Sequence, residues 1–242
     1  MASVERLAVV VTLPARTAGA AARDTARRLR DWSNNAVDDW GRDPQFAARM
    51  TTLSRLRWDV AVGGADRLPA RAGALIVVNA RRFAMAPVFA ALAIGDAVGR
   101  PVRFVGRPDI APIGPVLQRI GGLVAQPAEV EGALAAGELV VIGASHLPSN
   151  SVAGAVDRHL VGAAVATRVK VFPVATLSTP TRRSARVEIA AALRPSRIRR
   201  GPLAELEMAE LVERRLDALL IELGGSLTGT PLDWLASLRR SG

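Results

Sequence analysis

Cysteine is absent from this sequence, and histidine occurs only twice, at His146 and His159. Without cysteine the chain can form no disulfide, no thiol nucleophile and no cysteine-ligated metal site. A zinc site with two histidines would need an unusual set of carboxylate ligands, so we expect no metal. Aromatic residues are also few, four Trp and five Phe, and no stretch combines an aromatic platform with basic residues. We therefore expect no nucleic-acid partner.

Long apolar runs are missing as well, and we expect no secretory leader. Residues 1–14 lack a charged start followed by a long apolar stretch and a cleavage site. The longest uncharged apolar stretch, AMAPVFAALAIG (84–95), falls short of the roughly 20 residues that cross a bilayer as a helix. We expect a cytoplasmic protein, soluble or peripheral at the cytoplasmic face of the membrane.

The composition is apolar and strongly basic. Half of the 242 residues are hydrophobic, so the chain can bury a sizeable core. The formal net charge is +10, and every basic residue except Lys170 is arginine. A GC-rich genome explains part of the arginine and alanine content. The remaining positive charge favours anionic partners such as lipid headgroups and phosphorylated or CoA-bearing substrates.

Two amphipathic helices are predicted at the N-terminus, within residues 1–56. The first covers residues 17–40, where Ala and Trp recur every three or four residues between arginines, and ends at Gly41. The second begins at Pro44, and its expected buried stripe is Phe46, Met50, Leu53 and Leu56. We expect this helical pair to pack on the domain. The alternative is an arginine-rich helix lying on an anionic membrane surface.

From Trp58 onward, short β-branched runs alternate with helical segments. The predicted strands are 57–62, 74–78, 102–105, 123–126, 138–142, 170–176 and 185–191. The predicted helices are 86–97, 112–120, 127–136, 155–168 and 203–222. This order predicts an α/β fold with a mostly parallel sheet flanked by helices, as one domain over residues 57–223. The last helix is expected to face inward with Leu203, Leu206, Leu211, Leu216, Leu219 and Leu220.

Residues 224–242 are predicted to form a C-terminal extension, a glycine-containing loop leading to a short helix. Ligands of open parallel sheets bind outside the carboxyl ends of the strands. The two strand ends that matter most are therefore those followed by Asn79–Pro87 and by Gly143–Asn150.

Four segments in order resemble the glycerophospholipid acyltransferase family, the lysophosphatidic acid acyltransferase-like proteins. They are WDVAVGGADRLPARAGALIVVNARR (58–82), RFVGRPDIAPIGPVLQRIGGLVAQ (103–126), GELVVIGASHLPS (137–149) and VKVFPVATL (169–177). GRDPQF (41–46) is similar to actinobacterial members. The resemblance implies that family's α/β fold.

The resemblance also implies a catalytic mechanism whose residues are missing from this chain. In the family, a His directly after the strand's Asn takes the proton of the acceptor hydroxyl, and an Asp five residues later orients that His. This chain keeps Asn79 but has Ala80 and Met85 at the two catalytic positions. The arginine that binds acceptor phosphate is replaced by Gln126, and the Glu-Gly-Thr-Arg motif has no counterpart between Val141 and Val156.

Polar residues that survive at the two strand ends are the candidates for substrate binding. They are Asn79, Arg81, Arg82, Gln126, Ser145 and His146. Because imidazole titrates near neutrality, His146 is also a candidate relocated base, with Asp109, Asp157 or Glu188 as a spatial partner; the alternative is a loop histidine bonded to backbone. His159 is predicted to be structural or surface-facing.

The strongest basic cluster lies near the end of the domain, at Arg194, Arg197, Arg199 and Arg200, preceded by Arg182, Arg183 and Arg186. A membrane-facing role is one interpretation, because juxtamembrane arginines contribute about 1 kcal/mol each to binding of anionic bilayers. A charged loop that keeps an apolar protein soluble is the other.

Three hypotheses follow from the sequence. The first is an acyltransferase-fold protein without its His/Asp pair, which binds a lipid or an acyl-CoA or acyl-carrier thioester at the membrane surface and regulates or partners an active acyltransferase. The second is an active, divergent acyltransferase that uses His146 or substrate-assisted proton removal. The third is a protein-interaction scaffold without a lipid ligand. No cofactor is expected under any of them.

Overall fold

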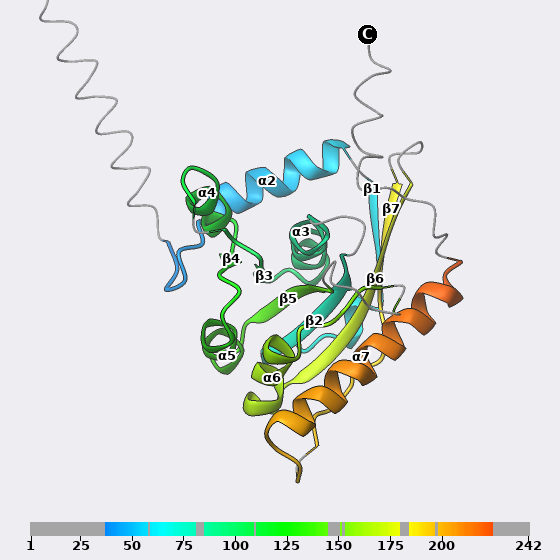
Figure 1. Cartoon of the computed structure of the whole chain (residues 1–242). Helices are drawn as coiled ribbons and strands as arrows, with labels where there is room; N and C mark the ends of the chain where they lie inside the picture. Colours follow the sequence, from blue (N-terminus) through cyan, green and yellow to red (C-terminus); the bar gives the residue numbers. More distant parts are fainter. Residues whose placement is uncertain are drawn as a thin grey trace, which may run out of the picture. The chain divides into compact units, whose positions relative to one another are not determined.

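The computed structural model describes residues 37–57, 59–80, 85–108, 110–144, 151, 153–179, 184–196 and 198–224 (Figure 1). Apart from Val37, these residues belong to one compact unit that begins at Asp38. Most of the predicted first helix lies outside the described residues, and residues 37–40 lead into a turn. The predicted C-terminal extension lies outside them beyond Gly224.

A mostly parallel seven-stranded sheet forms the centre of the fold, as predicted. Its order is β1-β7-β6-β2-β5-β3-β4. β6 and β7 are antiparallel, so β7 and its parallel neighbour β1 run against the other five strands. The strands are β1 (Asp59–Gly63), β2 (Ala74–Asn79), β3 (Val102–Val105), β4 (Gly122–Leu123), β5 (Leu139–Ala144), β6 (Lys170–Thr179) and β7 (Ser184–Ile189).

Helices cover both faces of the sheet (Figure 1). The helices are α2 (Pro44–Arg57), a 3-10 turn (Ala65–Arg67), α3 (Ala86–Val98), α4 (Ile113–Arg119), α5 (Pro127–Ala135), α6 (Arg158–Thr167) and α7 (Pro202–Glu222). Alternate residues of β2 divide between two cores. Leu75 and Val77 pack with α5, α6 and α7, whereas Ile76 and Val78 pack with α2 and α3. Burial on both faces explains why the central strands are continuous apolar runs.

Two predicted helix faces need correction. On α2, Leu53 is exposed and the small Ala47 is buried, flanked by partly buried Phe46 and Met50. On α7, Leu203 and Leu206 are exposed, so they do not face inward. The buried stripe of α7 follows a four-residue spacing that includes small residues: Ala204, Met208, Val212, Leu216 and Leu220. Close approach of α7 to the sheet and to α6 favours Ala over Leu in its first turns.

A fully buried guanidinium lies beside β3. Arg103 is 1% exposed, and its Nη2 lies 2.7 Å from an oxygen of Asp38. Its Nε lies 3.4 Å from a carboxylate oxygen of Glu138, and its Cζ stands 5.7 Å from the centre of the Trp40 ring. The two carboxylates, which are partly exposed, neutralise a charge that the core could not otherwise hold.

A second buried charged group, the carboxylate of Asp43, fixes the start of α2. Asp43 accepts a hydrogen bond from the backbone N–H of Phe46 at 3.0 Å, and its side chain also pairs with Arg119. Burial alone would raise the pKa of Asp43, but the bonds from Phe46 and Arg119 outweigh it and hold that pKa below its ordinary value of 3.8. The pKa of Asp38 is also lowered. Burial raises that pKa, but the hydrogen bond and charge of Arg103, together with hydrogen bonds from backbone N–H groups, outweigh the effect of burial.

These depressed pKa values predict an acid-sensitive fold. A carboxyl whose pKa is lower in the folded state stabilises the protein above its unfolded pKa, and that stability is lost as pH falls through the folded pKa. The urea midpoint should therefore stay level from neutral pH to about pH 5 and fall below about pH 4. Asp38→Asn and Asp43→Asn should each be less stable at pH 7 and show a shallower acid decline. A decline parallel to wild type in both variants would contradict this assignment.

Candidate functional site

The side chain of Asn79 continues the ladder between β2 and β6. Its Oδ1 accepts hydrogen bonds from the backbone N–H of Thr176 at 2.6 Å and from the Thr176 hydroxyl at 3.0 Å. Its Nδ2 donates to the carbonyl of Thr176 at 3.0 Å. The side-chain amide of Asn79 thus takes the place of a backbone in hydrogen bonding to Thr176, at the carboxyl end of β2. Most of the hydrogen-bonding capacity of Asn79 is used within the fold, which the sequence did not indicate.

Ala80, the first residue after β2, is enclosed. It is 7% exposed, and its β-carbon faces Gly143 of β5, a glycine that the ring of Pro87 also approaches. A Cβ added at Gly143 would lie 2.8 Å from the Cβ of Ala80 and 2.9 Å from Cγ of Pro87. The close approach therefore depends on Gly143 having no side chain. The position that a catalytic base would occupy by the family resemblance holds a small, buried methyl group.

Met85 stands at the N-cap of α3 and makes no capping hydrogen bond. The first turn of α3 contains no acidic residue, and Pro87 occupies its second position. Met85 is partly exposed at the carboxyl edge of the sheet. A thioether can neither accept a proton at neutral pH nor orient an imidazole.

The strand that leads to Ser145 and His146 lies beside the strand that ends in Asn79. β5 pairs with β2 in parallel, and Asn79 is opposite Ala144, the residue before Ser145. Ser145, His146, Arg81 and Arg82 themselves lie outside the described residues. Both polar segments therefore leave the same edge of the sheet from neighbouring strands.

The carboxylates considered as partners of His146 have other bonds in the structure. Asp157 caps α6, accepting from the backbone N–H of His159 at 2.8 Å, and Glu188 pairs with Arg186 at 3.0 Å. Asp109 lies outside the described residues. His159 is exposed on α6, which agrees with the second of its two predicted states, structural or surface-facing.

Two carboxylates of α7 hold the chain that returns from this edge. Asp217 accepts hydrogen bonds from the Ser151 hydroxyl and from the backbone N–H of Ala153, each at 2.9 Å. Glu213 accepts from the backbone N–H of Val156 at 2.7 Å. Ser151 and Ala153 are buried, so these acceptors satisfy donors that water cannot reach.

Replacing Asp217 with alanine should lower the free energy of unfolding by about 1–2 kcal/mol, because two buried donors would lose a charged acceptor. Denaturant unfolding measures the change. Asp217→Asn keeps one carbonyl acceptor and should recover part of the loss. Equal stability of Asp217→Ala and wild type would show that the return segment does not depend on α7.

Arg107 is a residue at this edge that the sequence analysis did not single out. It follows β3 directly, and its backbone N–H donates to the carbonyl of Leu123 at 3.0 Å. Its Nε is buried and has no hydrogen-bond partner within the described ranges. β3 is parallel to β5, and β5 is parallel to β2. Arg107 therefore lies at the carboxyl edge of the sheet, where Asn79 and Ala144 end their strands. The rule that ligands bind at carboxyl ends could have identified it.

Exposed apolar side chains gather on α4 and the segment before it. Ile110 is 67% exposed, Ile113 57% and Val116 45%. This α4 rim, Ile110, Ile113 and Val116, begins where the chain has left the carboxyl end of β3. Large apolar residues at such exposure are suited to contact an acyl chain, a bilayer or another protein.

The remaining predicted residues divide between the two edges of the sheet. Gln126 follows the carboxyl end of β4 and is exposed at the N-cap of α5. Arg194, Arg199 and Arg200 are exposed at the opposite, amino edge, because Leu193 pairs with Val171 near the start of β6. Arg199 pairs with Glu207, and Arg197 lies outside the described residues.

No metal or membrane-spanning feature appears in the described ranges. No three His, Asp or Glu side chains there are placed to hold a metal ion. None of the helices described there is both long and apolar enough to cross a bilayer.

Comparison with solved structures finds the fold in a known protein. The chain is similar to the crystal structure of the 1-acyl-sn-glycerophosphate (LPA) acyltransferase PlsC from Thermotoga maritima, with a TM-score of 0.50 and 20% sequence identity. The alignment covers 75% of this chain and 78% of that chain. This chain has an acyltransferase-like fold. Comparison with protein-family models finds no match, and neither does comparison with curated protein sequences.

Proposed function

We propose that this protein binds a lipid or an acyl thioester at the carboxyl edge of its sheet and does not transfer the acyl group. The observation that carries the proposal is the enclosure of Ala80, 7% exposed against Gly143 and Pro87, where a catalytic base would have to meet the acceptor. The acyltransferase-like fold persists around a position that can neither accept a proton nor admit a substrate hydroxyl.

The missing proton acceptor is decisive for acyl transfer to a hydroxyl. As the acceptor oxygen forms its bond to the thioester carbonyl, its proton must leave, and general bases contribute typically 10²–10⁴-fold to such steps. The alanine methyl and the Met85 thioether cannot take that proton. Guanidinium groups such as Arg107 remain protonated and can only bind an anionic part of the ligand.

Two features at the edge support ligand binding. The buried Nε of Arg107, which no described residue bonds, suits a phosphate of a phospholipid or of an acyl thioester such as acyl-CoA. The α4 rim offers exposed apolar surface on the same side of the sheet for an acyl chain. Arg107 and the α4 rim together supply one charged and one apolar contact, which is what an acyl-CoA or a phospholipid requires.

Organic extraction of the purified protein, followed by mass analysis, tests the binding claim. We expect acyl chains to copurify at a substantial molar fraction with wild type and to fall several-fold in Arg107→Gln. Arg71→Gln, an exposed arginine at the other edge, is the matched control and should retain wild-type lipid. Protein free of acyl lipid that also fails to take up acyl-CoA would favour a protein-interaction scaffold instead.

A divergent acyltransferase is the second candidate, favoured by the pairing of β5 with β2 next to Asn79. His146 would then take the proton, or an amine acceptor would need no strong base. Saturable acyl transfer that disappears in His146→Ala and survives in His159→Ala would establish this candidate. Absence of transfer in wild type, with lipid bound, agrees with the first proposal.

Membrane association should depend on the α4 rim rather than on the basic cluster. The rim and the exposed Arg199 and Arg200 lie at opposite edges of the sheet, so one flat bilayer cannot contact both. Burying two isoleucines contributes about 3 kcal/mol or more, so Ile110→Ser with Ile113→Ser should weaken flotation with anionic vesicles at least tenfold. Arg199→Gln with Arg200→Gln should change it little. The reverse pattern would place the basic cluster on the membrane.

A further inference from the structure

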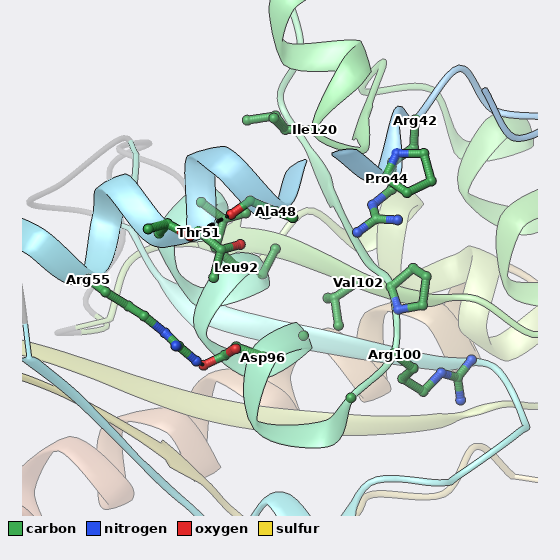
Figure 2. Close-up of a pocket in the computed structure, with 15 residues that line it drawn as sticks. Arg42, Pro44, Ala48, Thr51, Arg55, Leu92, Asp96, Arg100, Val102 and Ile120 are labelled. Carbon is green, nitrogen blue, oxygen red and sulfur yellow. Dashed lines mark hydrogen bonds and ion pairs between the residues drawn. The ribbon is translucent and has the colours of Figure 1, made fainter. Parts of the chain in front are cut away.

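A separate cavity of about 450 Å³ lies between α2 and α3. Figure 2 shows its lining, with the Arg55–Asp96 ion pair at one end and Arg42 at the other. The cavity is bounded by the C-terminal turn of α3 and the start of β3, so it belongs to the amino edge of the sheet. Apolar residues supply much of the lining: Pro44, Ala48, Ala91, Leu92, Val102 and Ile120.

Two of the three arginines in the lining are held by the fold. Arg55 of α2 pairs with Asp96 of α3 across the cavity. Arg100 donates to three backbone carbonyls, of Pro69 at 3.0 Å, Ala72 at 3.3 Å and Gly137 at 2.6 Å. Asp96 is the single carboxylate in the lining, and Arg55 already neutralises it. The lining therefore has an excess of positive charge.

The third arginine, Arg42, is different. Its guanidinium makes no hydrogen bond and no ion pair with any residue in the described part of the chain, although the group is about half buried. Burial lowers the pKa of Arg42, with the charge of Arg103 adding to the effect and the carboxylates of Asp38, Glu138 and Asp43 opposing it. Arginine still remains charged at neutral pH, so the fold holds a partly desolvated cation to which none of these carboxylates is bonded.

We propose that this cavity binds a small amphiphile whose oxyanion, a phosphate or a carboxylate, pairs with Arg42 and whose compact apolar body rests against α3 and β3. The planar fork of a guanidinium suits both oxyanions in bidentate geometry. The volume falls in the usual range for small-ligand sites, roughly 300–1,000 Å³. A cation is excluded as the ligand by the three arginines against one paired carboxylate.

This site is distinct from the carboxyl edge. α3 begins directly after Met85 at that edge, and the part of it from Ala91 to Asp96 lines the cavity. Along the helix axis these lining residues lie about 9–17 Å beyond Met85, at 1.5 Å per residue. A ligand in the cavity should therefore not compete with an acyl ligand at the carboxyl edge, and the inference does not rest on the function proposed above.

Isothermal titration of the full chain tests the site with three probes: hexyl phosphate, hexanoate and the uncharged hexanol. We expect hexyl phosphate or hexanoate to bind saturably, at least tenfold more tightly than hexanol, and the affinity to fall with added salt. Arg42→Gln should reduce that affinity tenfold or more. Arg49→Gln, an exposed arginine of the same helix outside the lining, should leave it unchanged. Inorganic phosphate is a fourth probe, which measures the contribution of the oxyanion without an apolar body. It should bind more weakly than hexyl phosphate.

A second variant keeps the charge and fills the space. Ala48→Leu adds bulk to the lining while retaining Arg42, and it should also weaken binding. Unfolding of each variant is followed in parallel, and Arg42→Gln should be at least as stable as wild type because it removes a partly buried charge that no residue in the described part of the chain pairs. Equal affinity in wild type and Arg42→Gln, hexanol binding as tightly as the anions, or no saturable binding at millimolar concentration would each overturn the proposal.

Discussion

Replacing Arg103 with alanine is expected to lower the free energy of unfolding by about 3–5 kcal/mol, the largest loss among the substitutions proposed for this protein. Arg103 is the bulkiest of the fully buried side chains in the described residues, and it is bonded to Asp38 and near Glu138. Its removal would leave a cavity under Trp40 and would take away the cation that both Asp38 and Glu138 contact. Domains are stable by only about 5–15 kcal/mol, so this variant should be close to unfolding at body temperature.

Denaturant unfolding with a surface control checks this result. Arg186 pairs with Glu188 but is largely exposed, so Arg186→Ala should cost less than about 1 kcal/mol. Arg103→Met, which fills much of the cavity, should fall between the two. A cost for Arg103→Ala no larger than for Arg186→Ala would mean that the buried network does not stabilise the fold.

Restoring the missing imidazole is expected to damage the protein without activating it. Ala80→His places a ring where the present methyl group is already enclosed by Gly143 and Pro87, and overpacking of this kind costs about 1–3 kcal/mol. The ring would also lack an orienting carboxylate, because Met85 stands at that position; loss of such an orienting group costs about 10⁴-fold in serine proteases.

Thermal unfolding and an acyl-transfer assay measure both parts of this prediction. Ala80→Ser, which adds one small atom, is the matched control and should stay near wild-type stability. If Ala80→His unfolded at the wild-type temperature and gained turnover, the position would be open and the site competent for transfer. That result would contradict the proposal that the enclosure of Ala80 prevents acyl transfer.

The sheet could be predicted from the sequence because its strands are short, apolar and separated by Gly or Pro. The predicted 102–105 matches β3, and the carboxyl-edge adjacency of β2 and β5 follows from parallel pairing. The observed ends of some helices and strands differ from the predicted ones where capping residues or turns set the boundary. α6 begins at Arg158 because Asp157 caps it, and β4 stops at Leu123 because the chain turns before Gln126 starts α5.

Features that depend on contacts distant in the sequence could not be predicted. The inward face of α7 follows Ala204 and Met208 rather than Leu203 and Leu206, because the sheet sets how closely a helix approaches. The bond of Asn79 to Thr176 joins residues 97 positions apart. The burial of Arg103, and of the Arg107 Nε that no described residue bonds, likewise becomes visible only when β3 is set beside its neighbours.

Native mass spectrometry of the wild-type chain, incubated with acyl-CoA and a glycerophosphate acceptor, tests the proposed binding without transfer most directly. The proposal predicts a complex that carries intact acyl-CoA, with no free CoA accumulating over many hours. Steady release of CoA with a matching gain of acylated acceptor would contradict it.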